Sequence, residues 1–275
     1  MIMSAYCYSK LQPPEHLKPY IDYFYSLKSA SSAGKGREEP WFPIGSMDLI
    51  FDIGAPFQQG NSSDTLTERP QAFVAGLYEQ GIKIKPTGPV HQVGIVFKPG
   101  KFRYFIKGDQ KDHKGVITPL SEIYGAESDR MMDLLTESKN EGERLQLLQL
   151  FAEETLRRDI KENYFIDHCV SKIKDSQGKI SLSDLAGKGK TSNRHFRRIF
   201  KDYVGLNPKL FSKMVRLQSL IKMSTESTED LNRLYDQLGY YDSSHLLRDF
   251  KNITGMRASE FFRKSELMSK IVLNA

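Results

Sequence analysis

The amino-acid sequence lacks the features that would place the chain in a membrane or outside the cell. It contains no run of about 18 consecutive apolar residues, so we expect no membrane-spanning helix. Residues 1–6 carry neither the basic segment nor the apolar core of a secretory signal, which predicts a cytoplasmic protein. Cysteine is scarce. Cys7 and Cys169 lie far apart without the spacing of metal ligands, so we expect two free thiols in a reducing compartment.

The motifs of the common enzyme classes are also absent. The sequence has no Gly-x-Ser-x-Gly, no P-loop and no paired carboxylates, so we predict that the protein is not an enzyme and needs no cofactor. His16, His91 and His113 form no His-x-His pair and have no acid at ligand spacing, which argues against a metal site.

Only the C-terminal part of the chain has fewer acidic than basic residues. Residues 161–275 contain 21 Lys and Arg against 13 Asp and Glu, whereas residues 1–160 contain 19 against 21. The net charge of +6 therefore comes from the C-terminal part, which indicates a polyanionic partner there. A chance imbalance of surface charge is the alternative, and the pattern of residues has to decide between them.

Residues 1–125 consist of short β-type segments separated by glycine and proline, such as residues 47–53, 72–77 and 92–97. Segments of this kind at regular intervals predict a β-sandwich or barrel. The polar stretches 29–39 and 58–69 are predicted as loops. A few large aromatic side chains either line an effector pocket or form the β core, and the sequence leaves both open; they are Trp41, Phe42, Phe73, Tyr78 and Phe97.

Helical periodicity replaces this pattern after residue 125. The sequence thus predicts an α+β protein with three parts. Residues 1–125 form a β-rich sensor or dimerisation domain, residues 126–160 a helical connector, and residues 161–275 an all-α domain of two helix-turn-helix units.

The C-terminal part contains an internal repeat with an offset of fifty residues. Residues 195–211 match residues 245–261, for example at Phe200 and Phe250. In each copy a short helix is followed by a glycine-containing turn and a second helix. Ser192 and Asp242 are good N-caps for the second helices. Between the copies, Asn207-Pro208 begins a longer helix that joins the two units.

The second helix of each copy has one apolar and one polar face. The apolar faces comprise Phe196, Ile199, Phe200 and Tyr203 in the first copy and Leu246, Phe250 and Ile253 in the second. The polar faces comprise Asn193, Arg194, Arg197, Arg198 and Lys201 in the first copy and Ser243, Ser244, Leu247, Arg248 and Lys251 in the second. Because the second helix of a helix-turn-helix enters the major groove, we predict that the polar faces contact double-stranded DNA.

These residues resemble the DNA-binding domain of the AraC family of bacterial transcription regulators. The resemblance covers about residues 165–265 and rests on Ser192 to Lys201, Gly205 to Pro208, and Leu238 to Leu246. It implies base contacts from Arg194, Arg197 and Arg198 in the first unit, and from Ser243, Ser244, Leu247 and Arg248 in the second. The sequence departs from the family pattern at Gly189-Lys190, which replaces an apolar residue and a glycine, at Tyr235 (usually alanine) and at Ala258 (usually proline).

Three segments of the N-terminal half, residues 17–21, 43–51 and 94–100, are similar, more weakly, to the β-rich sensor domain found in one branch of the family. The resemblance implies that this half binds a small effector or dimerises. If it binds an effector, Trp41, Phe73, Tyr78 and Phe97 are the candidate ligand residues. In the alternative reading it is only a dimerisation or protein-contact domain, and RNA polymerase is a possible partner of the protein as a whole. The sequence leaves these two readings open. It argues against a third, an enzyme with a DNA-targeting tail, because no catalytic set is present.

Overall fold

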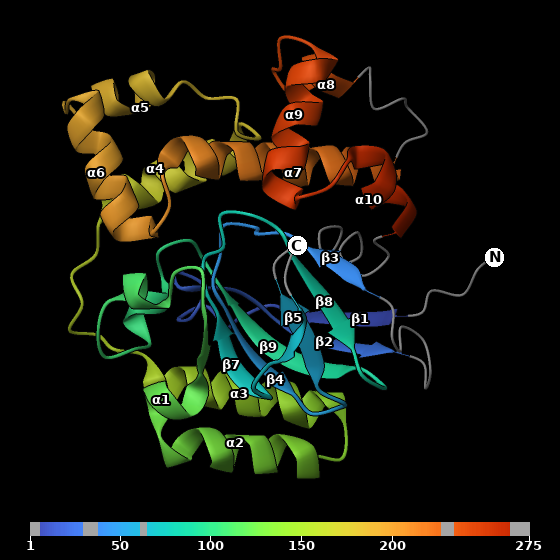
Figure 1. Ribbon diagram of the computed structural model, residues 1–275. Coiled ribbons are helices and arrows are strands. Elements are labelled where there is room, and N and C mark those ends of the chain that lie inside the picture. The colour runs from blue at the N-terminus through green and yellow to red at the C-terminus, as the bar shows by residue number, and fades with distance from the viewer. Residues whose placement is uncertain (1–5, 30–37, 61–64, 227–233, 265–275) are drawn as a thin grey trace.

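The computed structural model describes residues 6–29, 38–60, 65–226 and 234–264, and they form an α+β protein (Figure 1). A β-rich domain lies against a helical domain, which confirms the predicted fold class. Within the described residues, no helix combines the length and apolar composition needed to cross a membrane.

The β-rich domain is built from two antiparallel sheets packed face to face. The larger sheet has the order β1 (Tyr6–Leu11), β2 (Ile21–Ser29), β9 (His91–Phe97), β4 (Asp48–Asp52), β7 (Ala72–Ala75) and β10 (Ile117–Pro119). The smaller has the order β3 (Glu39–Trp41), β8 (Ile82–Pro86), β5 (Phe57–Gly60) and β6 (Thr67–Glu68). Part of the stretch predicted as a polar loop therefore forms strands, because Gln58 and Gln59 pair with residues of β6.

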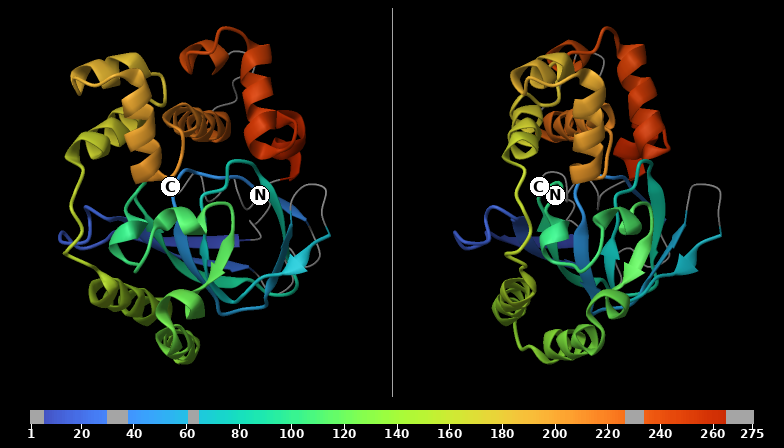
Figure 2. Two further views of the ribbon diagram at one scale, coloured as in Figure 1. Left: turned by 60° about the vertical axis from the view of Figure 1, so that its left-hand side comes forward. Right: turned by 90° about the vertical axis from the view of Figure 1, so that its left-hand side faces the viewer.

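Three helices cover the outer face of the larger sheet, on the side away from the helical domain (Figures 1 and 2). They are α1 (Leu120–Tyr124), α2 (Ala126–Glu137) and α3 (Glu141–Thr155). Phe51 of β4 contacts Phe151 of α3 edge to face, with ring centroids 6.4 Å apart. Glu141 accepts a hydrogen bond from Ser26 and pairs with Lys28 at 2.6 Å. Although partial burial raises the pKa of Glu141, these two partners hold it at about 2.

The helical domain consists of α4 (Tyr164–Asp175), α5 (Leu182–Lys188), α6 (Asn193–Val204), α7 (Pro208–Glu226), α8 (Leu234–Gln237), α9 (Ser243–Thr254) and α10 (Ala258–Lys264). The long α7 connects the unit of α5 and α6 to the unit of α8 and α9 (Figures 1 and 2). Ser192 and Asp242 accept hydrogen bonds from the backbone N–H groups of His195 and His245, which confirms both predicted N-caps. The repeat extends to the helix ends, since α6 and α9 both stop at a left-handed glycine.

The turn between α5 and α6 is strained at Lys190, where the family pattern has a glycine. Its φ of 48° lies in the left-handed region, which costs a residue with a Cβ about 1–2 kcal/mol. Lys190→Gly should therefore raise the free energy of unfolding by about 0.5–1 kcal/mol, because the greater freedom of glycine in the unfolded chain offsets part of the gain. Urea denaturation measures this, with Lys188→Gly at the last residue of α5 as the control that should bring no gain, because Lys188 has no positive φ. No gain for Lys190→Gly would show that the turn is unstrained.

Candidate nucleic-acid interface

The polar face of α6 is open to solvent along its whole length. Every side chain assigned to this face is exposed; they are Asn193, Arg194, Arg197, Arg198 and Lys201. Arg198 is partly engaged, since it contacts His195 Nδ1 at 3.2 Å and Asp202 at 4.0 Å. Arg194, Arg197 and Lys201 form no ion pair with any described residue. Unpaired cations on one helix face are suited to contact phosphates and the acceptor atoms of guanine.

The opposite face of α6 is fixed by a chain of aromatic contacts. Phe196 packs against Phe165 of α4 and against Phe200, with ring centroids 6.1 and 5.7 Å apart. Phe200 in turn contacts Phe211 of α7 at 5.8 Å. Three residues of the predicted apolar stripe, Phe196, Phe200 and Tyr203, are buried, and Ile199 is half-buried. The arginines are therefore held on a helix that packs against α4 and α7.

The polar face of α9 carries fewer charges. Ser244, Leu247, Arg248 and Lys251 are exposed, whereas Ser243 is half-buried. Leu247 keeps 40% of its surface exposed, which suits an apolar contact such as a thymine methyl group. The predicted apolar residues Leu246, Phe250 and Ile253 are all buried.

Sequence reasoning missed an ion pair that ties α9 to α7. Asp249 is buried, and its carboxylate accepts a hydrogen bond from Lys213 Nζ at 2.6 Å. No sequence signal distinguishes Asp249 from a solvent-facing acid, because its burial depends on where α7 crosses α9.

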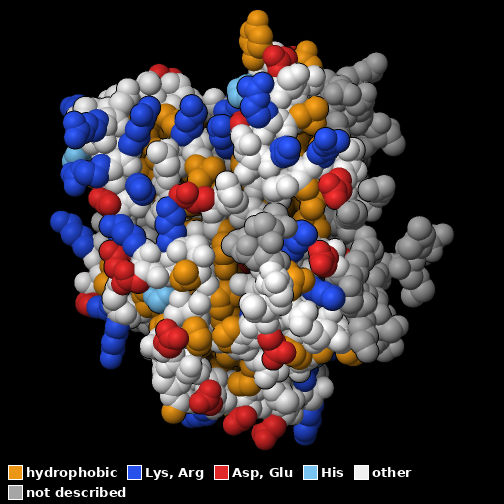
Figure 3. Space-filling view, in the orientation of Figure 1, with side chains coloured by type: hydrophobic (Ala, Val, Ile, Leu, Met, Phe, Trp, Pro, Cys, Tyr) orange, Lys and Arg blue, Asp and Glu red, His pale blue; other side chains and the backbone are white. Residues whose placement is uncertain are grey.

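The two recognition helices α6 and α9 point the same way relative to the β-rich domain. In Figures 1 and 2 both run from the far side of the helical domain toward the sheets, with α7 lying across them. Their N-terminal halves, where base-reading residues of such helices lie, therefore face away from the β-rich domain. Figure 3 shows Lys and Arg side chains gathered over the helical domain on the side of α5 and α6.

The C-terminal end of α6 is anchored on the β-rich domain through Tyr203. Its hydroxyl accepts a hydrogen bond from Lys101 Nζ at 3.1 Å and lies 3.3 Å from the hydroxyl of Tyr104. Its carbonyl accepts a hydrogen bond from Gln110. Lys101 also pairs with Asp167 of α4 at 2.7 Å. One buried lysine therefore connects the β-rich domain to two helices of the first unit.

A single loop, residues 76–81, touches the ends of both recognition helices. The side chain of Leu77 covers Gly205, where an added Cβ would lie 2.4 Å from Leu77 Cδ1. At the other end of the loop, Gly81 N–H donates to the Ile253 carbonyl at 2.7 Å. The loop and α7 together set the separation of α6 and α9. Nothing in the sequence pattern pointed to this loop.

The aromatic residues predicted to line an effector pocket do not all meet. Trp41, Phe73 and Tyr78 line a cavity of about 10 Å³ between the sheets, which is room for about one water molecule. Phe97 lies elsewhere, packed on Phe102 and Phe105 with centroids 5.2 and 4.7 Å away. The reason is strand alternation. Val96, the preceding residue of β9, pairs with Asp48 of β4 and lies on the face of the larger sheet that is turned toward the smaller sheet. Successive residues of a strand alternate between the two faces, so Phe97 points to the opposite face of the larger sheet.

Buried polar groups fill the space between the sheets that an effector would need. Arg69 lies over the ring of Phe73 at 4.6 Å and pairs with Asp52 at 3.0 Å. Gln92 donates a further hydrogen bond to Asp52 at 2.6 Å. Burial raises the pKa of Asp52, and the contacts with Arg69 and Gln92 oppose that shift.

Two segments of this chain match known protein families. Residues 185–264 match a family described as a helix-turn-helix domain, and residues 9–116 match a domain of unknown function. A curated relative, an uncharacterized HTH-type transcriptional regulator of Haemophilus influenzae, is 29% identical over 93 residues. That match spans 34% of this chain and 31% of the relative, so it concerns about a third of either protein.

The overall arrangement is similar to solved structures of ToxT from Vibrio cholerae. One has a TM-score of 0.52 at 10% sequence identity and covers 88% of this chain and 98% of ToxT. Another, of ToxT bound to (E)-4-(8-methylnaphthalen-1-yl)but-3-enoic acid, has a TM-score of 0.50 at 10% identity and covers 94% and 99% of the two chains. At this identity the likeness concerns the fold, in which a β-rich domain precedes a double helix-turn-helix domain.

Proposed function

Residues 185–264 are a helix-turn-helix domain of the AraC type. We infer that the protein is a sequence-specific DNA-binding transcriptional regulator. The observation that carries this proposal is the pair of recognition helices, α6 and α9. Their N-terminal halves lie on the side of the helical domain away from the β-rich domain, and most of the cations on α6 have no acidic partner among the described residues.

The two units contribute differently to DNA recognition in this proposal. Arg194, Arg197 and Arg198 supply several donors each, which suits the O6 and N7 acceptors of guanine. Ser243, Ser244 and Leu247 supply fewer donors, so the block of bases read by α9 tolerates more sequences. Arg248 is a further base contact of the second unit. Asn193, Lys201 and Lys251 would contact the phosphates beside these blocks, and such contacts fix orientation rather than sequence.

Selection of bound DNA from a random pool with the full-length protein tests the function. We expect an asymmetric site with two specified blocks, of which the block read by α6 is richer in guanine. Affinity for this site should fall steeply between low and physiological salt, because phosphate contacts release counterions. DNA recognition by this domain would be contradicted if no DNA sequence were enriched from the pool, or if the affinity did not change with salt concentration.

Arg197→Ala should cost about 1–3 kcal/mol of binding free energy on the selected site and relax base preference at one or two positions, as expected for a base contact. Lys201→Ala, one turn further along α6, is the matched control. It should weaken binding to all sequences about equally and reduce the salt slope by about 1. Fluorescence anisotropy with a panel of single-base variants measures both. If Arg197→Ala leaves base preference unchanged, Arg197 contacts only the backbone.

We also propose that the β-rich domain makes the regulator responsive to a small molecule. Two observations support this proposal: residues 76–81 touch the ends of both recognition helices, and a ToxT structure of the same fold holds a butenoic acid derivative. The second candidate is a β-rich domain that only dimerises or contacts protein partners. Thermal denaturation of the protein against a metabolite library separates them, since a ligand that binds the folded state raises the melting temperature.

A further inference from the structure

The turn before α9 is one residue longer than the turn before α6. In the first unit, Lys190 adopts the left-handed conformation with a φ of 48°, and Ser192 caps α6 two positions later. In the second unit, Gly239 adopts this conformation with a φ of 68°, and Asp242 caps α9 three positions later. The second copy of the repeat therefore has one extra residue in the turn.

Backbone hydrogen bonds identify the extra residue as Tyr241. In the first turn, Thr191 N–H donates to the carbonyl of Ala186 at 3.2 Å. Tyr240 N–H makes the equivalent bond, to the carbonyl of Tyr235 at 2.9 Å, so Tyr240 takes the place of Thr191. Tyr241 stands between Tyr240 and the N-cap, and it has no counterpart in the first unit.

The side chain of Tyr241 projects from this turn into solvent. It is 91% exposed, the highest value among the large apolar side chains that the structure describes. The neighbouring backbone is held in place. The ring of Tyr240 is buried and contacts Arg216 of α7 at 4.9 Å and His245 at 5.2 Å. A large aromatic side chain is thus displayed on a fixed turn.

Tyr241 lies next to the start of α9, at the end of that helix that faces away from the β-rich domain (Figures 1 and 2). If α9 enters a major groove, the turn before it lies at the edge of the groove, where the phosphates run. Tyrosine hydroxyls donate hydrogen bonds to phosphate oxygens. Residues 239–247 contain no lysine or arginine, so Tyr241 is the longest hydrogen-bond donor that this end of α9 offers to the DNA.

We propose that Tyr241 donates a hydrogen bond to a phosphate beside the second block, with its ring against the adjoining deoxyribose, and thereby positions α9 in its groove. The proposal deepens the inferred DNA-binding function and rests on it. Because the donor is neutral, this contact releases no counterion, unlike a contact from a lysine. Its loss should therefore lower affinity without changing either the salt slope or the base preference.

Fluorescence anisotropy of the full-length protein on the selected DNA site tests this contact. Tyr241→Phe removes only the hydroxyl and should weaken binding about 5-fold or more, and Tyr241→Ala should weaken it about 10-fold or more. For both variants, the salt slope and the base preference should equal those of the wild-type protein. On a shorter duplex that contains only the first block, all three proteins should bind equally, because α9 then meets no DNA.

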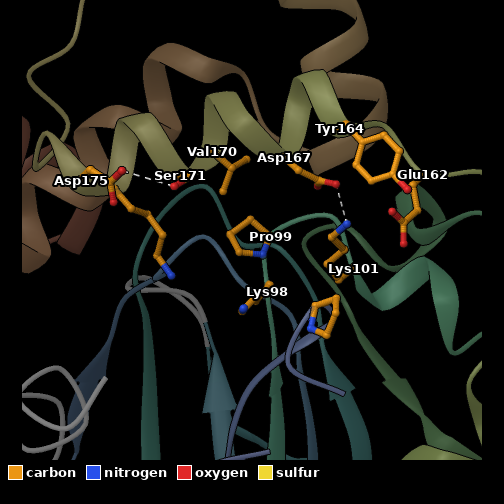
Figure 4. Close-up of a pocket in the computed structure, with 11 residues that line it drawn as sticks. Lys98, Pro99, Lys101, Glu162, Tyr164, Asp167, Val170, Ser171 and Asp175 are labelled. Atoms are coloured by element: carbon orange, nitrogen blue, oxygen red, sulfur yellow. Dashed lines mark hydrogen bonds and ion pairs between the residues drawn. The ribbon is translucent and has the colours of Figure 1, made fainter. Parts of the chain in front are cut away.

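Tyr164→Phe and Tyr164→Ala are the matched controls. Tyr164 is also well exposed, at 76%, but it lines a cleft of about 470 Å³ between α4 and the β-rich domain (Figure 4). It therefore lies on the side of the helical domain opposite to the N-terminal ends of the recognition helices. Both controls should bind DNA as tightly as the wild-type protein, and melting temperatures check that every variant folds.

Three results would overturn the role of Tyr241: equal binding by Tyr241→Phe and wild type on the full site, a change in base preference or salt slope, or the same loss on the shorter duplex. If the wild-type protein binds no DNA sequence preferentially, the proposed function fails and this proposal fails with it. If the wild-type protein binds its site and the Tyr241 variants bind it equally well, only the role of Tyr241 is contradicted.

Discussion

Inserting about 5 base pairs between the two blocks of the selected site should lower affinity by about 100-fold or more, toward the affinity left by the first block alone. The two recognition helices are expected to enter successive major grooves on one face of the DNA, about 34 Å apart. Half a helical turn of extra DNA moves the second block to the opposite face. The helix α9 cannot move to reach that block, because α7 and residues 76–81 both connect α6 to α9 and fix their separation.

Fluorescence anisotropy on three DNA duplexes measures this loss. The control duplex keeps the original spacing but carries a scrambled second block, and its affinity should equal that of the duplex with the insertion. If instead the insertion leaves affinity unchanged, α9 enters no groove, and its role is structural or lies in contacting RNA polymerase.

Replacing Asp52 by Ala should cost about 3–5 kcal/mol of unfolding free energy, because it leaves the guanidinium of Arg69 buried without its partner. Asp52 and Arg69 have side chains only 1% and 6% exposed, and two hydrogen bonds of 3.1 and 3.3 Å join them. Between the sheets there is no bulk water to take over the lost contacts.

Urea denaturation at neutral pH measures the effect, and a double variant isolates its cause. Asp52→Ala combined with Arg69→Met removes both charges and should recover most of the lost stability, since an apolar side chain can replace a buried ion pair at little cost. A single-variant loss below about 1 kcal/mol would show that water reaches Arg69 and that the space between the sheets opens readily.

The sequence by itself was sufficient for the helical domain. The repeat with an offset of fifty residues, the caps at Ser192 and Asp242, and the buried stripes of α6 and α9 all appeared where the pattern predicted them. The caps and the apolar stripes depend on residues within one or two helical turns of each other, so periodicity and capping preferences are enough to find them. The repeat is found by comparing the sequence with itself. The DNA-contact residues assigned to these faces stay a prediction, although nearly all of them are exposed.

The tertiary structure alone decided which distant residues meet. Aromatic composition suggested one site for Trp41, Phe73, Tyr78 and Phe97, but the register of β9 turns Phe97 to the other face of the sheet. The hydrogen bond from Lys101 to Tyr203 joins residues 102 positions apart on separate domains. Such contacts arise from how two domains pack, and no local preference of the chain encodes them.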